Sequence, residues 1–125
     1  MFLSLKAELR RIGNTIRWSL EGWRAAWASE KSLRQWTVLH AISSGAALLL
    51  PLEPGARALI IALGFLVLAA ELFNTAIETA VDDISGRPRA AARKAKDCAS
   101  AGVALCALAA ASAWGVSLWG LIAGG

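Results

Sequence analysis

The sequence has few of the residues that bind transition metals or form disulfides. Its 125 residues include one histidine, two cysteines and no Cys-x-x-Cys pair. Cys98 and Cys106 would be about 12 Å apart along a helix, which is too far for a disulfide bond between them. These counts argue against a zinc site and predict two free thiols. His40 is isolated in an apolar run, so we expect it to be packed and hydrogen-bonded and not to bind a ligand.

Polar residues are also scarce for a chain of this length. Hydrophobic residues make up 57% of the sequence and the mean hydropathy is +0.53, yet Lys and Arg together number 13 and the formal net charge is +4. The basic residues flank hydrophobic runs and do not line one soluble face, so no nucleic-acid partner is expected. The composition instead predicts one membrane domain over residues 1–125, with basic segments near anionic lipid headgroups.

Hydrophobic patterning predicts an all-α membrane protein with one surface helix and three transmembrane helices. Residues 4–28 place apolar side chains, including Trp23 and Trp27, on one stripe with charged side chains largely outside it. That pattern is typical of an amphipathic helix lying in the membrane surface. Transmembrane helices are predicted over residues 33–52, 56–81 and 98–122. A turn containing Pro51 and Pro54 separates the first two, and a polar linker over residues 82–96 separates the last two.

Basic residues are distributed unevenly around these predicted spans. Seven precede the first span, five lie between the second and the third, and only Arg57 lies between the first and the second. Because cytoplasmic segments of membrane proteins carry an excess of Lys and Arg, the N-terminus and the long linker are predicted to be cytoplasmic. The C-terminus at Gly125 would then face outward.

The second predicted span carries polar groups where a bilayer tolerates few. Glu71, Asn74, Glu78 and Asp82 follow at intervals that place them on one helix face, and a basic segment comes next. Ionisable groups at membrane depth are costly, so they mark function by default. Carboxylate and amide oxygens suit Mg²⁺, and the neighbouring cations would attract phosphate, so the pattern indicates phosphoryl transfer. The alternative is that these side chains only join helices, but a graded row ending beside five cations favours a site.

At these residues the sequence resembles the prokaryotic diacylglycerol kinase family of small membrane enzymes. The resemblance is carried by the segment Glu71-Leu-Phe-Asn74-Thr75-Ala76-Ile77-Glu78, then Asp82, then Ala95-Lys96-Asp97. Arg24-Ala25-Ala26-Trp27, followed by Glu30 and Arg34-Gln35, places it nearer the Gram-negative members, and the similarity covers roughly residues 8–120. No Gly-rich phosphate loop or protein-kinase loop signature is present, which excludes the soluble kinase folds.

The resemblance implies an ATP-dependent lipid kinase of the bacterial inner membrane. Such an enzyme is a homotrimer with active sites shared between subunits, and it uses Mg²⁺ to phosphorylate the primary hydroxyl of diacylglycerol, giving phosphatidate. By motif, Glu71 would be the general base, Asn74 would orient the base or the acceptor, and Asp97 would join them in the catalytic set. Glu30 and Glu78 would bind the metal beside the nucleotide. Further nucleotide contacts would fall on Arg11, Trp18, Arg87, Arg89, Lys96 and Asp97, and lipid contacts on Arg24, Ala25, Ala26, Trp27, Arg34, Gln35, Glu71 and Ser100.

Two other functions remain open at this point. Within the same family, the acceptor would be undecaprenol, and only the lipid pocket would differ. In a different class, the chain would be a transporter or ion-relay subunit in which Glu71 and Glu78 carry ions. That function needs polar groups continuing to the outer side, yet residues 58–70 are apolar, which indicates a cytoplasmic pocket and not a path across the bilayer.

Overall fold

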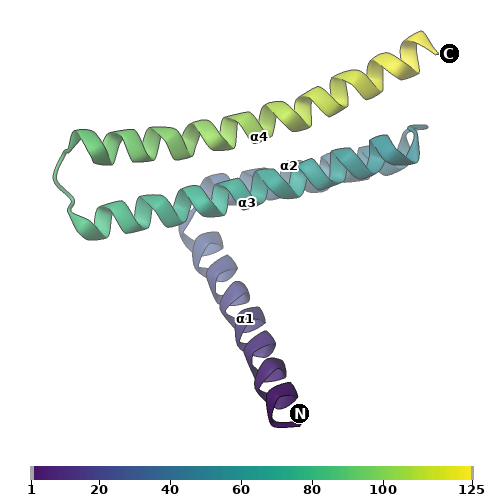
Figure 1. Cartoon of the computed structure of the whole chain (residues 1–125). Coiled ribbons are helices and arrows are strands. Elements are labelled where there is room, and N and C mark those ends of the chain that lie inside the picture. Colours follow the sequence, from purple (N-terminus) through teal and green to yellow (C-terminus); the bar gives the residue numbers. More distant parts are fainter. Residues whose placement is uncertain (1, 125) are drawn as a thin grey trace.

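A computed structural model describes residues 2–124 as four helices with no strand among them, which confirms the predicted all-α class. The helices are α1 (Phe2–Ser29), α2 (Lys31–Leu49), α3 (Pro54–Ile84) and α4 (Ala90–Ala123). Helices α2, α3 and α4 run alongside one another, and α1 projects from them at a steep angle (Figure 1). Met1 and Gly125 belong to the predicted domain over residues 1–125 but lie outside the described residues. The prediction that Gly125 faces outward therefore also concerns a residue outside the described part.

The helix boundaries differ from the predicted ones where prolines and the loop intervene. Helix α2 ends at Leu49 and not at residue 52. Leu50 precedes Pro51 and adopts the extended backbone conformation that residues before proline prefer. Pro54 begins α3, where its missing N–H costs no hydrogen bond. Residues 85–89 are the only non-helical part of the predicted 82–96 linker, because α4 starts at Ala90, well before the predicted residue 98.

Two small clusters of buried side chains hold the helices together. One joins the ends of the helices far from the α3–α4 loop and contains Ala47, Leu52, Ile60 and Ala113. The other lies where α1 meets the bundle and contains Ala26, Leu33 and Leu68. Leu33 is fully buried, so the second cluster fixes the first turn of α2 against α3.

His40 packs directly over a glycine of the neighbouring helix. A Cβ atom on Gly64 of α3 would lie only 2.0 Å from Nδ1 of the His40 ring. The same Nδ1 lies 3.4 Å from the Ser44 hydroxyl, and the ring meets Phe65 edge-on with 4.5 Å between centroids. The prediction that His40 is packed and hydrogen-bonded is therefore confirmed.

The bundle surface is largely apolar. Helices α3 and α4 are each long and apolar enough to cross a membrane, as the second and third predicted spans require, and their crossing stays a prediction. Their large apolar side chains are more than half exposed at Phe65, Leu66, Phe73, Leu105, Leu108, Val116 and Trp119. A water-soluble protein rarely exposes so much apolar surface. Helix α2 is less hydrophobic than α3 and α4, because it contains the polar residues Lys31, Arg34, Gln35 and His40. That α2 crosses the membrane therefore also stays a prediction.

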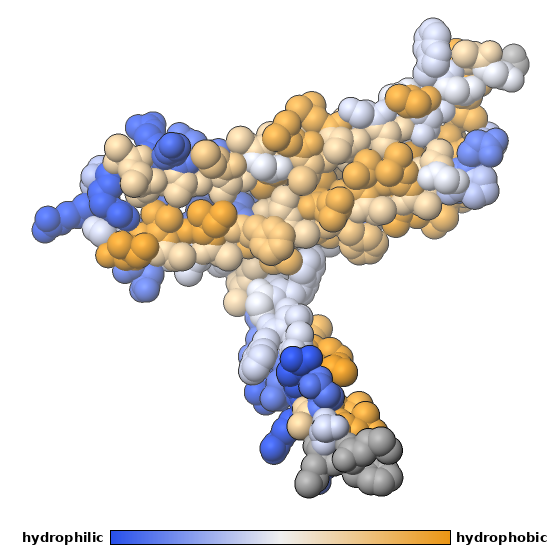
Figure 2. All heavy atoms as spheres, viewed as in Figure 1, coloured by the Kyte–Doolittle hydropathy of each residue, from blue (hydrophilic) through white to orange (hydrophobic). Residues whose placement is uncertain are grey.

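Polar groups gather at particular places on the surface. Figure 2 shows apolar residues over the middle of the bundle and hydrophilic ones at the α3–α4 loop. It also shows α1 with an apolar side and a charged side, and Leu5, Leu9, Ile12 and Ile16 on that helix are all exposed. This amphipathic helix agrees with the predicted 4–28 segment.

Candidate active site

Glu71 is the one polar or charged side chain that is buried among residues 4–124, with only 4% exposure. It lies one turn of α3 beyond Leu68, which packs with Ala26 and Leu33. The hydroxyl of Ser32, in the first turn of α2, donates a hydrogen bond to Glu71 Oε1. A carboxylate in an apolar bundle is stable only where such donors reach it. Glu71 is thus the most deeply buried charged group among the described residues.

Ser32 is a site residue that sequence reasoning missed. It lies only two positions after Glu30, but 39 positions separate it from Glu71. A serine in the first turn of a helix is ordinary, so no sequence signal pairs it with a glutamate of another helix. Only the packing of Leu33 against Leu68 brings the two side chains together.

Asn74 and Glu78 continue the polar face of α3 toward the loop. Asn74 Nδ2 donates a hydrogen bond of 3.4 Å to Glu78 Oε1, and both side chains are partly buried. The Asn74 Oδ1 atom is buried and has no partner in the described part of the chain. An unpaired buried carbonyl oxygen is costly, so this atom is free to accept a hydrogen bond from a donor outside the described chain.

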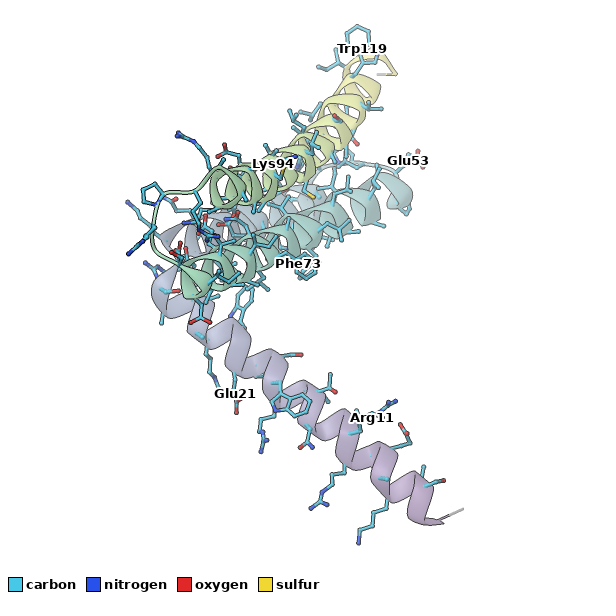
Figure 3. The ribbon with its side chains drawn as sticks, turned by 60° about the vertical axis from the view of Figure 1, so that its left-hand side comes forward. Arg11, Glu21, Glu53, Phe73, Lys94 and Trp119 are labelled. Carbon is cyan, nitrogen blue, oxygen red and sulfur yellow. The ribbon has the colours of Figure 1, made fainter. Side chains whose placement is uncertain are left out.

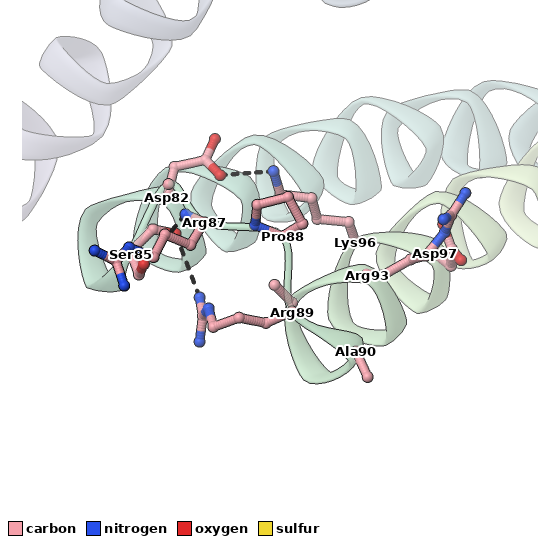
Figure 4. A pocket seen from close by; sticks show the side chains of 11 residues that line it. Asp82, Ser85, Arg87, Pro88, Arg89, Ala90, Arg93, Lys96 and Asp97 are labelled. Carbon is pink, nitrogen blue, oxygen red and sulfur yellow. Dashed lines mark hydrogen bonds and ion pairs between the residues drawn. The ribbon is translucent and has the colours of Figure 1, made fainter.

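The α3–α4 loop forms a cationic cavity of about 570 Å³ (Figure 4). Asp82 from α3 and Lys96 from α4 close one side of it with an ion pair of 2.6 Å. Four predicted nucleotide contacts, Arg87, Arg89, Lys96 and Asp97, are among its lining residues. The cavity thus brings these four residues together beside the last carboxylate of the α3 face.

Arg89 also has a role within the loop itself. Its Nη2 donates to the carbonyl oxygens of Val81 and Ser85, at 3.3 and 3.4 Å. Cations near the last carbonyls of a helix satisfy those oxygens and oppose the helix dipole. Arg89 therefore holds the loop against the end of α3 while it adds charge to the cavity.

The predicted metal ligands, Glu30 and Glu78, lie on different elements. Glu30 forms the junction between α1 and α2, where its Oε1 accepts a hydrogen bond of 3.1 Å from Ser29. No group of three or more His, Cys, Asp and Glu side chains gathers anywhere in residues 2–124. Mg²⁺ is nevertheless usually bound by only one or two protein carboxylates, with phosphate oxygens and waters as its remaining ligands. The oxygen donors of these two residues therefore suit Mg²⁺ by their chemistry, while each carboxylate has its own separate hydrogen-bond partner in this chain.

Two predicted nucleotide contacts lie apart from the loop cavity. Figure 3 shows Arg11 on the part of α1 that extends away from the bundle, and its guanidinium pairs with Glu8 at 3.0 Å. Trp18, on the same helix, is 57% exposed. Neither residue lines the cavity between α3 and α4. Within one chain the structure therefore does not bring Arg11 and Trp18 to Lys96.

The predicted lipid contacts fall mainly where α1 joins the bundle. Arg24 and Trp27 line one hollow, and Ala25 and Ala26 line another between α1 and α3. Arg34 Nη1 donates to the carbonyl oxygen of Trp27 at 2.5 Å, so it fixes the end of α1. Ser100, exposed on α4, lines neither hollow, and Gln35 is exposed on α2.

Comparison with known proteins gives one consistent match. The sequence model of a family described as prokaryotic diacylglycerol kinase matches residues 17–118. A diacylglycerol kinase of Pseudomonas aeruginosa is 41% identical over 93 residues, which cover 74% of this chain and 76% of the relative. A diacylglycerol kinase of Escherichia coli K12 is 34% identical over 109 residues, covering 87% of this chain and 89% of the relative. The matched region includes every part of the site except Arg11.

Proposed function

The chain belongs to the prokaryotic diacylglycerol kinase family and is a lipid kinase, and from this premise we propose that it transfers the γ-phosphoryl group of ATP to the primary hydroxyl of diacylglycerol. The product is phosphatidate. The observation that carries the proposal is the buried Glu71 carboxylate, held by Ser32 on a helix face that leads to a cationic cavity. A buried carboxylate beside an apolar surface can meet a lipid hydroxyl, and cations at the far end of the same face can meet a nucleotide.

Glu71 is the general base in this proposal. The acceptor hydroxyl gives its proton to the Glu71 carboxylate as its oxygen attacks the γ-phosphorus. The bond between that phosphorus and the bridging oxygen of the β-phosphate breaks, and ADP leaves. Asn74 lies one turn along α3 from the base and orients the base or the acceptor.

The nucleotide binds toward the loop. Lys96 contacts phosphate, Asp97 joins the catalytic set, and Arg87 and Arg89 add positive charge to the cavity. When bound, Mg²⁺ would neutralise phosphate charge, and Glu30 and Glu78 would hold it. The glycerol backbone of the lipid lies against the segment from Arg24 to Trp27, with Arg34, Gln35 and Ser100 as further contacts.

We extend the proposal to a homotrimer with shared sites. Arg11 and Trp18 do not reach the loop cavity of their own chain, and the Glu30 and Glu78 carboxylates are only partly covered. A neighbouring subunit would supply the missing side of each site. The proposed location is the bacterial inner membrane, with a cytoplasmic N-terminus that follows from the distribution of basic residues.

A phosphate-transfer assay tests this function. Purified protein in mixed micelles is given radiolabelled ATP and Mg²⁺ with either diacylglycerol or undecaprenol, and label is measured in each lipid. Label in phosphatidate, with much less on undecaprenol, is the expected result. Preferential labelling of undecaprenol would reassign the acceptor, and no labelling of either lipid would refute the proposed activity.

A further inference from the structure

The contact between Ser32 and Glu71 joins two helices at the most buried charged residue of the described part of the chain. Ser32 is partly buried in the first turn of α2, and its hydroxyl donates to Oε1 of Glu71 on α3. No other side-chain donor reaches the Glu71 carboxylate among the described residues. The backbone carbonyl of Glu71 is occupied separately by the Thr75 hydroxyl at 3.0 Å.

The position of Ser32 suits an anion. The first amides of a helix have no partner within the helix, and together with the helix dipole they favour negative charge. Glu71 therefore meets the N-terminal turn of α2 through Ser32, and the fully buried Leu33 prevents this turn from moving away. A carboxylate in such surroundings needs its donors, because an uncompensated buried charge is strongly unfavourable.

The hydrogen bond also fixes which oxygen is available. A glutamate side chain has three rotatable bonds, so an unrestrained carboxylate samples several orientations. With Oε1 bound to Ser32, the second oxygen is left to face the acceptor. A general base must lie within hydrogen-bond reach of the proton it removes, so fixing it raises the share of productive complexes.

We propose that Ser32 is a positioning residue that orients Glu71 for proton abstraction, an inference that rests on the proposed function. Ser32 keeps its own proton throughout the reaction. The proton of the lipid hydroxyl passes to the second carboxylate oxygen of Glu71 as the new oxygen–phosphorus bond forms. In this proposal Ser32 acts through Glu71 and is given no contact with the nucleotide or the metal, so its loss should affect turnover and leave substrate affinity intact.

Three variants test the inference in the full-length protein. Ser32→Ala removes the hydroxyl, Ser32→Thr retains it, and Ser112→Ala is the control. The Ser112 hydroxyl donates only to the carbonyl of Leu108 in its own helix, at 2.7 Å. For each variant kcat and the KM values for Mg-ATP and lipid are measured in mixed micelles, together with the thermal midpoint.

The expected result for Ser32→Ala is a fall in kcat of about 10-fold, with both KM values within about two-fold of wild type, as the loss of one hydrogen bond to a charged group suggests. Ser32→Thr should recover most of the turnover, and Ser112→Ala should match wild type. Because Ser32→Ala leaves the buried carboxylate without its side-chain donor, a lower thermal midpoint is expected, so kcat is measured at a temperature at which the variant is fully folded. Unchanged kcat under these conditions, or a fall explained by a raised KM, overturns the inference while lipid kinase activity stands. A wild-type protein that phosphorylates no lipid overturns the proposed function and this inference together.

Discussion

Replacing Gly64 by alanine should destabilise the bundle, although alanine is the better helix former. A Cβ atom at this position would lie 2.0 Å from Nδ1 and 2.5 Å from Cε1 of His40. The ring would have to move, and it would give up its contacts with Ser44 and Phe65. Such overpacking costs about 1–3 kcal/mol. The better helix propensity of alanine offsets about 1 kcal/mol of this cost.

The net destabilisation is therefore about 1 kcal/mol, or about 4 °C in the thermal midpoint of a domain of this size. The assay is thermal unfolding of purified protein in detergent. Gly45→Ala on α2 is the matched control, because a Cβ atom there meets nothing within 4 Å, and this variant should be as stable as wild type or more stable. In a His40→Ala background the Gly64→Ala change should become neutral or stabilising, since the obstructing ring is gone. If Gly64→Ala raised the midpoint while His40 is present, the packing argument would be refuted.

Three further predictions concern the proposed site. Glu30→Gln and Glu78→Gln should each raise the Mg²⁺ concentration needed for half-maximal activity while assembly persists, because each removes an anionic ligand; wild-type activity at limiting Mg²⁺ would remove that residue from the metal site. A cysteine at Arg89, introduced after the native cysteines are replaced, should react with a membrane-impermeant thiol reagent only from the cytoplasmic side, and labelling from outside would refute the topology. Inactive Glu71→Gln and Lys96→Met chains should regain part of the activity when mixed, because shared sites would then include some complete ones; mixtures as inactive as the parents would argue that each site lies within one chain.

The sequence predicted much of the fold because its signals are local. Apolar runs and proline turns indicated the helices, and the intervals between Glu71, Asn74 and Glu78 placed these residues on one face of α3. Helix α2 ends three residues before the predicted end at residue 52, and α4 begins eight residues before the predicted span 98–122, which lies within it. The polar residues 90–96 lacked an apolar pattern, although nothing in them prevents a helix from continuing.

Contacts between helices could not be predicted in the same way. The Ser32–Glu71 bond and the packing of His40 on Gly64 each join residues whose pairing depends on how whole helices meet. The capping of α3 by Arg89 depends instead on how the α3–α4 loop folds back on the end of α3. Arg89 was expected to contact a nucleotide, and its bonds to the end of α3 have no signature in the sequence. The gathering of Arg87, Lys96 and Asp97 around one cavity likewise emerges only when α3 and α4 are folded together.

The most direct test of the account is the turnover of Glu71→Gln. Glutamine keeps the size of glutamate but cannot take a proton, so it removes the base without leaving a void. We predict that transfer of labelled phosphate from ATP to diacylglycerol falls by about 10²–10⁴-fold in kcat, the usual contribution of a general base, while nucleotide binding and thermal stability are retained. A Glu71→Gln enzyme that turns over within a few-fold of wild type would contradict the account, because the buried carboxylate would then not be the base.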